Sequence, residues 1–151
     1  MSGHQLKTIA ITGASSGLGK ALSEHFLKLG HTVIGISRNI REDLFTSPNW
    51  KSITCDLTKE PDLKALCQKL KNIEYIDALI LNAGFGIFSF LEQQSWLQIS
   101  QQFQSNVLGH IFIVKSLISK LKTQKEARII FTGSEASLEG QKLGSIYCAS
   151  K

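Results

Sequence analysis

Proline and cysteine are scarce in this sequence, and both shortages narrow what the chain can be. Its 151 residues include two prolines and no stretch rich in proline, glycine and serine that would read as a linker. We therefore expect residues 1–151 to form a single domain. The three cysteines, Cys55, Cys67 and Cys148, are an odd number without a C-x-x-C pair, which argues against a disulfide framework and against a zinc site.

Long hydrophobic runs are also absent. No uncharged apolar stretch approaches the roughly 18 residues that a membrane-spanning helix needs. The opening MSGHQLK leads into a short apolar run that a glycine ends, which is not the pattern of a signal peptide. We therefore expect a cytoplasmic protein with no membrane partner.

Charge of one sign is not concentrated in any part of the chain. Lysine and arginine outnumber aspartate and glutamate by 17 to 12, for a formal net charge of +5, but the basic residues are scattered among apolar ones. No basic stripe with interleaved aromatic residues accompanies this charge. We therefore expect a solvated basic surface and no nucleic-acid partner.

What the sequence does contain is a regular alternation of short apolar runs and helical patterns. Continuous apolar strands between helices are typical of a parallel sheet covered on both faces. We predict an α/β fold with a doubly wound, Rossmann-type sheet that stops after its fifth strand. The predicted strands are 7–13, 31–38, 50–56, 76–84 and 127–134. The predicted helices are 17–29, 59–71 with Thr58 as its N-cap, and 95–106 leading into 107–122.

Two of the predicted helices carry apolar stripes that we assign to packing. The stripe of helix 17–29 is Leu18, Leu22, Phe26 and Leu29. One stripe of helix 107–122 is Val107, Ile111, Val114, Ile118 and Leu121, and a second begins with Leu108 and Phe112. Because one stripe is enough to cover the sheet, the second indicates burial against another subunit.

The turn after the first predicted strand is TGASSGLG, Thr12 to Gly19. Its glycines allow a tight turn and let backbone N–H groups at a helix N-terminus approach a diphosphate, while its serines add hydroxyl donors. These residues are Gly13, Ser15, Ser16, Gly17 and Gly19. The spacing is neither G-x-G-x-x-G nor the G-x-x-x-x-G-K-[ST] of a triphosphate-binding loop. A dinucleotide site is the resulting prediction.

The residues after the second predicted strand bear on which dinucleotide binds. An NAD site places a carboxylate there to accept hydrogen bonds from the ribose hydroxyls. This chain has Ser37 at that place and Arg38 next to it, and an arginine can pair with a 2′-phosphate through two hydrogen bonds. NADP(H) is favoured over NAD(H), with a solvated loop arginine as the alternative for Arg38.

With these residues in view, the chain resembles the short-chain dehydrogenase/reductase family along its whole length. The matching motif residues are Thr12, Gly13, Gly17 and Gly19; Asp56 in CDL; Asn82, Ala83 and Gly84 in LNAG; Asn106; Ser134; and Tyr147 with Lys151 in Y-x-x-x-K. The resemblance implies that NADP(H) is bound by these glycine-turn and strand-end residues and by Tyr147 and Lys151. Further cofactor contacts are expected from Ser15, Ser16, Leu18, Ser37, Arg38 and Leu57.

The four catalytic matches also make chemical sense. Hydride transfer at a carbonyl needs a group that protonates the alkoxide and removes the alcohol proton in reverse, a role that fits Tyr147. Lys151 lies one helical turn away, where a cation favours the phenolate. Ser134, thirteen residues before Tyr147, would orient the carbonyl. Asn106 would anchor a water that links the lysine to solvent, although a helix-capping amide explains this residue equally well.

The sequence departs from the family pattern at two places, neither of which removes a catalytic group. Leu81 replaces the first asparagine of N-N-A-G, and Gly133 stands where serine is more frequent. We interpret His110 as a surface or packed residue rather than a catalyst. Cys148 is interpreted as a packing residue, because no histidine base is recognisable beside it.

We predict an NADP(H)-dependent oxidoreductase with a small alcohol or carbonyl substrate and no metal. Its family resemblance implies a homo-oligomer, a dimer or tetramer, paired through helix 107–122 and the helix that carries Tyr147. One alternative is a dinucleotide-binding module without turnover. A methyltransferase using S-adenosylmethionine is a third hypothesis, but it does not explain Arg38 or the Tyr147–Lys151 pair.

The substrate itself is not predicted. The segment GFGIF, Gly84 to Phe88, is a candidate hydrophobic wall. In the family the selectivity loop and the last strands follow the catalytic lysine, and Lys151 is the last residue of this sequence. We therefore expect a cofactor-binding portion, incomplete at its C-terminal end and with little activity of its own.

Overall fold

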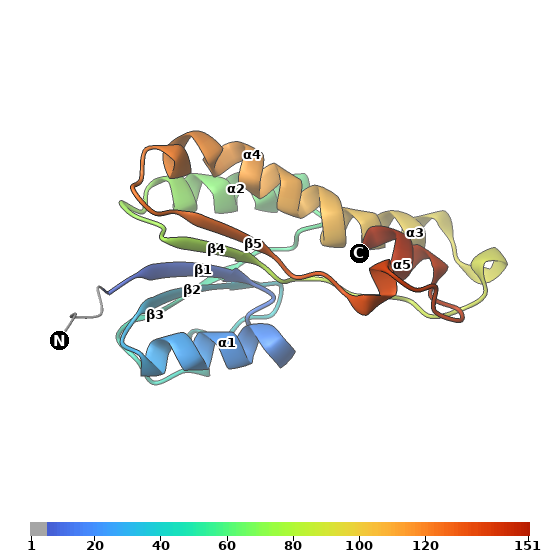
Figure 1. The fold of residues 1–151 in the computed structure, drawn as a ribbon, viewed down its shortest axis with the longest axis horizontal. Coiled ribbons are helices and arrows are strands. Elements are labelled where there is room, and N and C mark those ends of the chain that lie inside the picture. Colours follow the sequence, from blue (N-terminus) through green and yellow to red (C-terminus); the bar gives the residue numbers. More distant parts are fainter. Residues whose placement is uncertain (1–5) are drawn as a thin grey trace.

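Five parallel strands form one sheet in the computed structural model, which describes residues 6–151 (Figure 1). The strands are β1 (Thr8–Thr12), β2 (Thr32–Ser37), β3 (Trp50–Thr54), β4 (Ala78–Leu81) and β5 (Arg128–Phe131). Their order is β3-β2-β1-β4-β5, so the direction of winding reverses between β1 and β4. In such sheets the crevice at this reversal is where ligands bind. The predicted strands and the doubly wound fold are confirmed.

Helices lie on both faces of the sheet, with α1 on one side and α2 and α4 on the other (Figure 1). The α-helices are α1 (Gly17–Lys28), α2 (Glu60–Lys71), α3 (Trp96–Phe103), α4 (Gly109–Lys122) and α5 (Ser145–Ser150). Short 3₁₀ turns are η1 (Glu42–Leu44), η2 (Leu91–Gln93) and η4 (Glu135–Ser137), and one π-helical turn, η3, spans Gln104–Leu108. The predicted helix 95–122 is therefore α3, η3 and α4 in succession.

The two faces of the sheet are served by alternate residues of the same strands. Ile9 and Ile11 of β1 belong to a cluster that Leu22 and Phe26 of α1 complete. Ala10 belongs to the opposite cluster, which contains residues of α2 and α4. Burial on both faces explains why the strands are continuous apolar runs without polar alternation.

Two predictions about helix ends and faces are wrong. Thr58 does not cap α2, because its hydroxyl donates to the Asp56 carboxylate (2.8 Å) and the N-cap is Lys59. Leu18 and Leu29 do not pack on the sheet but are largely exposed, so only Leu22 and Phe26 of the predicted stripe contribute to the core.

The buried stripe of α4 also differs from the predicted one. Its most buried members are His110, Ile113, Leu117 and Leu121, whereas Ile111 is 52% exposed. Of the predicted stripe only Leu121 is fully buried, with Val114 packed at the margin. His110 is polar, so an apolar pattern does not reveal this stripe; in the fold its imidazole has a hydrogen-bond partner in the Thr12 hydroxyl.

Strand β5 forms one edge of the sheet, and its outward residues are exposed. Ile130 and Phe131 keep 45% and 56% of their surface accessible. Among residues 6–151 no helix is both long enough and apolar enough to cross a membrane.

Candidate cofactor cleft and active site

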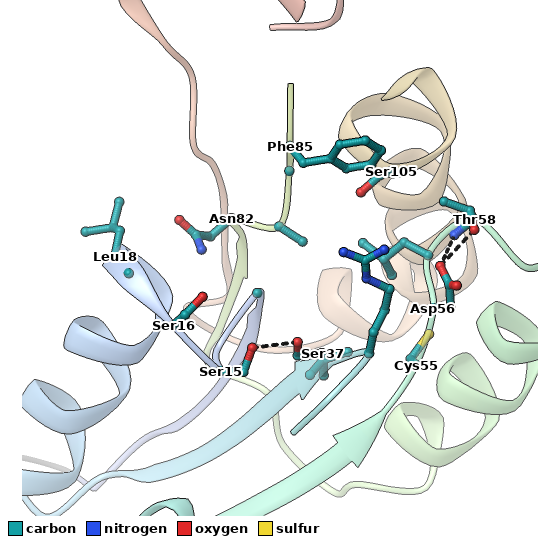
Figure 2. Close-up of a pocket in the computed structure, with 17 residues that line it drawn as sticks. Ser15, Ser16, Leu18, Ser37, Cys55, Asp56, Thr58, Asn82, Phe85 and Ser105 are labelled. Carbon is teal, nitrogen blue, oxygen red and sulfur yellow. Dashed lines mark hydrogen bonds between the residues drawn. The ribbon is translucent and has the colours of Figure 1, made fainter. Parts of the chain in front are cut away.

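A cleft of about 310 Å³ opens where β1, β2, β3 and β4 end, and Figure 2 shows the residues that line it. Of the predicted cofactor residues, it gathers Gly13, Ser15, Ser16, Gly17, Leu18, Ser37, Arg38, Asp56, Leu57, Asn82, Ala83 and Gly84. The other lining residues, which the sequence did not predict as cofactor contacts, are Ile36, Cys55, Thr58, Phe85 and Ser105. Leu18 turns toward this cleft, which explains its exposure.

Two glycines of the turn have backbone angles that other residues rarely adopt. Gly13 has φ +71°, and a Cβ there would lie 2.9 Å from Cα of Ala83, so the turn packs directly on the segment after β4. Gly17 has φ +51°, and nothing lies within 4 Å of where its Cβ would be. The first turn of α1 therefore presents bare backbone to the cleft, which suits a diphosphate.

Thr12 and Gly19 lie behind the turn and do not line the cleft. The Thr12 hydroxyl accepts hydrogen bonds from the backbone N–H groups of Asn82 (2.9 Å) and Ala83 (3.0 Å), and so ties β1 to the segment after β4. A Cβ on Gly19 would overlap the carbonyl of Gly13. Both residues shape the turn from within.

The end of β2 supplies hydroxyl groups and a cation to the cleft. The hydroxyls of Ser15 and Ser37 share a hydrogen bond of 2.8 Å (Figure 2). The guanidinium carbon of Arg38 lies 5.9 Å from the ring centroid of Phe85, a cation–π contact that reaches toward the other side of the cleft. The end of β2 therefore presents Ser37 and the following Arg38 to the cleft, and no carboxylate.

Asp56 is the acidic residue of the cleft, and its carboxylate is already engaged. Its Oδ1 accepts from the backbone N–H (3.0 Å) and the hydroxyl (2.8 Å) of Thr58 (Figure 2). Partial burial pushes the pKa of Asp56 upward, but the bonds from Thr58 and the charges of Arg38 and Lys59 outweigh it and leave the pKa below its ordinary value. Its second carboxylate oxygen remains for a ligand.

A second pocket, of about 480 Å³, adjoins the first and brings together three of the four predicted catalytic residues. Ser134, Tyr147 and Lys151 all line it. The other lining residues are Leu18, Asn82, Gly84, Phe85, Gly86, Phe88, Thr132, Gly133 and Gln141. Leu18, Asn82, Gly84 and Phe85 also line the first pocket, so the two spaces meet. We call the first the cofactor cleft and the second the reaction pocket.

Tyr147 and Lys151 are held by different neighbours. The Tyr147 ring packs against Phe88, with 5.5 Å between ring centroids, and a Cβ on Gly86 would lie 2.7 Å from Cδ2 of Tyr147. The Lys151 ammonium donates to the carbonyl of Thr132 (2.8 Å), just beyond β5. The tyrosine is thus positioned by packing and the lysine by a backbone carbonyl.

Ser134 sits between the end of β5 and η4, as its N-cap. Its hydroxyl oxygen accepts from the N–H of Ala136 (3.2 Å), while the hydroxyl hydrogen stays available for a partner in the pocket. A hydroxyl donor and a phenol on one pocket are the groups needed to bind a carbonyl oxygen and transfer a proton to it.

Asn106, the fourth predicted catalytic residue, does not line either pocket. It lies buried in η3, where its side-chain oxygen accepts from the N–H of Phe85 (3.0 Å). Its amide nitrogen donates to the carbonyl of Phe85 (2.9 Å) and to the hydroxyl of Ser150 (2.8 Å). The side chain therefore clamps the segment after β4 to α5, one residue before Lys151, and it is not a helix cap.

His110 of α4 is buried, as expected from the packed alternative predicted for it. Its Nε2 lies 3.3 Å from the hydroxyl of Thr12, and its ring meets that of Phe131 edge to face. Burial lowers the pKa of His110 to about 4, and the nearby charge of Lys151 adds to this, against a hydrogen bond with the backbone of Asn106. The imidazole is therefore neutral at pH 7.

The cysteines of residues 6–151 form no disulfide bond. All three cysteines are free, and burial together with Asp62, Asp56 and Cys67 raises the pKa of Cys55 to about 12. Burial also raises the pKa of Cys67. In this described part of the chain, no three histidine, cysteine or acidic side chains gather as a metal site would require.

Several known proteins are similar to this chain in sequence. The chain is 30% identical over 148 residues to the 3-ketodihydrosphingosine reductase of Bacteroides thetaiotaomicron, covering 97% of this chain and 54% of that protein. It is 28% identical over 153 residues to the NADPH-dependent pterin aldehyde reductase of Arabidopsis thaliana, covering 96% and 63%. The chain thus spans little more than half the length of these relatives.

A solved structure has a similar fold. The bulky-bulky ketone specific alcohol dehydrogenase from Comamonas testosteroni superposes with a TM-score of 0.90 at 28% identity, covering 98% of this chain and 63% of that one. The family model for short chain dehydrogenases matches residues 7–151. That match includes every motif residue in the cofactor cleft and the reaction pocket, and the chain therefore belongs to the short-chain dehydrogenase family.

Proposed function

We propose that this chain supplies the cofactor-binding and catalytic residues of an oxidoreductase that transfers hydride between NADP(H) and a small alcohol or carbonyl substrate. The observation that carries the proposal is the meeting of the two pockets. Ser134, Tyr147 and Lys151 line a space that adjoins the glycine-turn cleft. A cofactor bound along the cleft would bring its reactive end beside these side chains.

The bound cofactor would supply the hydride, and residues of this chain would handle the proton and the carbonyl. Tyr147 is the proposed acid and base, and Ser134 the proposed donor that orients the substrate oxygen. Lys151 would favour the phenolate and bind the nicotinamide ribose. Asn106 would act through the segment it clamps, and the water relay predicted from the sequence remains a prediction.

The chain's own residues fit a dinucleotide phosphate. The bare backbone at Gly17 leaves room for the diphosphate, and the free oxygen of Asp56 suits the adenine amino group. Ser15, Ser37 and Arg38 form a rim with hydrogen-bond donors and a positive charge where a ribose 2′-phosphate would lie. These features support NADP(H) over NAD(H). One relative is named as NADPH-dependent.

Two further properties belong to this proposal. Leu108 and Ile111 on the outer side of η3 and α4 are 48% and 52% exposed, which supports a homo-oligomer that covers them. The three free cysteines support a reducing compartment such as the cytoplasm.

The proposal is tested by removing the Tyr147 hydroxyl. In the complete protein, Tyr147→Phe should lower the rate of NADPH oxidation with a carbonyl probe such as 4-nitrobenzaldehyde by roughly 10²- to 10⁴-fold, the range that proton transfer contributes. The dissociation constant for NADPH, measured by fluorescence titration, should change little because the phenol lies in the reaction pocket.

Tyr75→Phe is the matched control, because Tyr75 is 59% exposed and lines neither pocket. It should leave both quantities unchanged. Undiminished turnover in Tyr147→Phe would refute the acid/base role. NADPH binding without turnover by the wild-type protein toward any carbonyl or alcohol probe would favour the dinucleotide-binding module.

A further inference from the structure

Residues 85–88 belong to no strand or helix, and Phe85, Gly86 and Phe88 of this segment line the reaction pocket. The backbone polar groups of such a segment need partners when they are withdrawn from water. At two of its residues, Phe85 and Ile87, the N–H and the C=O both bind side-chain amides. Asn106 hydrogen-bonds to the backbone of Phe85, and Gln102 and Gln94 hydrogen-bond to the backbone of Ile87.

Each side-chain nitrogen and oxygen of the glutamine pair has a hydrogen-bond partner. Gln102 Oε1 accepts from the N–H of Ile87 (3.0 Å), and Gln102 Nε2 donates to Gln94 Oε1 (3.0 Å) and to the carbonyl of Gln98 (3.3 Å). Gln94 Nε2 then donates to the carbonyl of Ile87 (3.4 Å). Gln102 has no exposed surface, so each of these bonds replaces one to water.

The spacing of the two clamps follows from simple geometry. Gln102 and Asn106 are four residues apart on the helical segment, a rise of about 6 Å at 1.5 Å per residue. Phe85 and Ile87 are two residues apart in a segment without regular structure, where a fully extended chain would advance about 6.6 Å. One helical segment carries both of the amides that bind these two residues.

Between the two clamped residues lies Gly86, which touches the proposed catalytic tyrosine. A Cβ at Gly86 would lie 2.7 Å from Cδ2 of Tyr147, and Phe88, the next residue after Ile87, stacks on the same ring. A shift of Ile87 would therefore carry both of these contacts with it. The position of the Tyr147 ring depends on the segment that the amides hold.

We propose that Gln102, oriented by Gln94, is a positioning residue of the reaction pocket. It fixes Ile87, and through Gly86 and Phe88 it sets the wall against which Tyr147 and a carbonyl substrate lie. The inference rests on the proposed function for its consequence in turnover. It stands on the hydrogen bonds and burial of Gln102 for its consequence in structure.

An amide is the side chain that this position requires. Leucine would fill a similar volume but would leave the N–H of Ile87 and the oxygen of Gln94 without partners. Glutamate would keep the acceptor for Ile87, yet in its ionised form it would place a second acceptor against Gln94 Oε1. Gln102→Leu and Gln102→Glu therefore test different parts of the clamp.

The structural test follows Tyr147 directly. In the complete protein labelled with 3-fluorotyrosine, the ¹⁹F resonances of Tyr147 and Tyr75 are assigned by their loss in Tyr147→Phe and Tyr75→Phe. Gln102→Leu should shift or broaden the Tyr147 resonance and leave that of Tyr75 in place. Gln101→Leu is the control, because Gln101 lies on the same helix but its side chain makes none of the clamp's hydrogen bonds.

The kinetic test separates positioning from general damage. Gln102→Leu should raise the KM for 4-nitrobenzaldehyde by at least roughly tenfold, the scale expected for a lost buried hydrogen bond, while the dissociation constant for NADPH stays within twofold. Gln102→Glu should approach wild-type KM at low pH and the leucine variant at high pH. Gln94→Leu should show a smaller rise and serves if Gln102→Leu fails to fold.

The outcomes that overturn the proposal are distinct from those that overturn the proposed function. An unmoved Tyr147 resonance, or a KM change no larger than that of Gln101→Leu, refutes positioning by Gln102. Equal losses in NADPH binding and aldehyde KM show a structural role only. If the wild-type protein oxidises no NADPH with the probe, the proposed function fails and the ¹⁹F comparison still decides the role of Gln102.

Discussion

The cofactor cleft and the reaction pocket share four lining residues but are built in different ways. The cleft is made mainly by backbone: a glycine turn and the ends of four adjacent strands, fixed by the sheet itself. The residues that line the reaction pocket lie outside the strands, and side chains hold their segments together through Asn106, Gln102 and Lys151. Near this pocket, Leu143, between the lining residue Gln141 and α5, has φ +63°, a backbone angle that non-glycine residues rarely adopt.

This difference has a physical consequence for how each region fails. A site built from backbone tolerates changes in neighbouring side chains, but it loses ligand binding when an added side chain fills its space. A side-chain-built site is lost when one hydrogen bond is removed, because each bond fixes a different segment.

The largest effect is expected from filling the cleft. Gly17→Asp places a carboxylate where a diphosphate would lie, at a φ that aspartate tolerates better than most residues. Like-charge contacts of this kind cost several kcal/mol, so the dissociation constant for NADPH should rise by roughly 10²- to 10³-fold. Fluorescence titration measures this, with a melting temperature close to wild type.

Gly140→Asp is the control for this variant, because Gly140 also has open space around it but lines neither pocket. It should bind NADPH normally. Equal weakening in both variants would mean that added negative charge, and not filling of the cleft, causes the loss.

The next largest effect concerns His110, which contacts Thr12 behind the cleft and lines neither pocket. Its pKa is lowered to about 4 by burial, whereas an unfolded histidine titrates near 6.5. Between these values the unfolded state binds more protons, so the stability that neutral His110 confers is complete above pH 6.5 and is lost as the pH falls toward 4. The loss should reach about 3 kcal/mol at most.

Urea unfolding of the wild type and of His110→Gln between pH 7 and pH 4.5 measures this effect. The free energy of unfolding should fall more steeply with decreasing pH in the wild type than in the variant. His25→Gln is the control, since His25 is exposed and should leave the wild-type pH dependence intact. A wild-type slope retained in His110→Gln would show that carboxylates alone cause the acid loss.

A smaller effect should sharpen the account of cofactor choice. Arg38→Leu removes a charge-assisted partner for a 2′-phosphate, so NADPH should bind roughly 10- to 100-fold more weakly, while NADH changes by less than about threefold. Arg41→Leu is the matched control, because Arg41 pairs with Asp43 and lines neither pocket. Equal effects on NADPH and NADH would refute selection by Arg38.

The smallest effect is a difference in thiol reactivity within the cleft. Burial and nearby carboxylates hold the pKa of Cys55 at about 12, so this thiol should stay unmodified by iodoacetamide at pH 8 even though it lines the cofactor cleft. Mass spectrometry of the folded protein measures the labelling. Rapid modification of Cys55, matching that in 8 M urea, would show that the end of β3 opens readily.

The same division explains what the sequence could predict. The strands and the glycine turn were predictable because continuous apolar runs and glycine spacing are local signals. The turn's geometry was confirmed at Gly13 and Gly17. The meeting of Ser134, Tyr147 and Lys151 followed from their positions after β5 and on α5, together with the family resemblance.

Other features depend on contacts that no local pattern records. Thr58 has the right residue type for a helix cap, but its hydroxyl donates a hydrogen bond to the carboxylate of Asp56, two residues earlier. The buried face of α4 includes His110, whose side-chain partner is Thr12, 98 residues earlier in the sequence. Gln102 carries no signal in the sequence, because a glutamine on an amphipathic helix normally faces water, and its partner Ile87 lies in a segment without regular structure.

Ile130 and Phe131 of the edge strand β5 are exposed apolar side chains, and among residues 6–151 no strand pairs with the outer side of β5. Such an edge is a template on which another strand can add, and it carries only Arg128 as a charged guard. Solubility at high concentration should therefore be set by this edge, and a lysine in place of Ile130 should delay precipitation without touching either pocket.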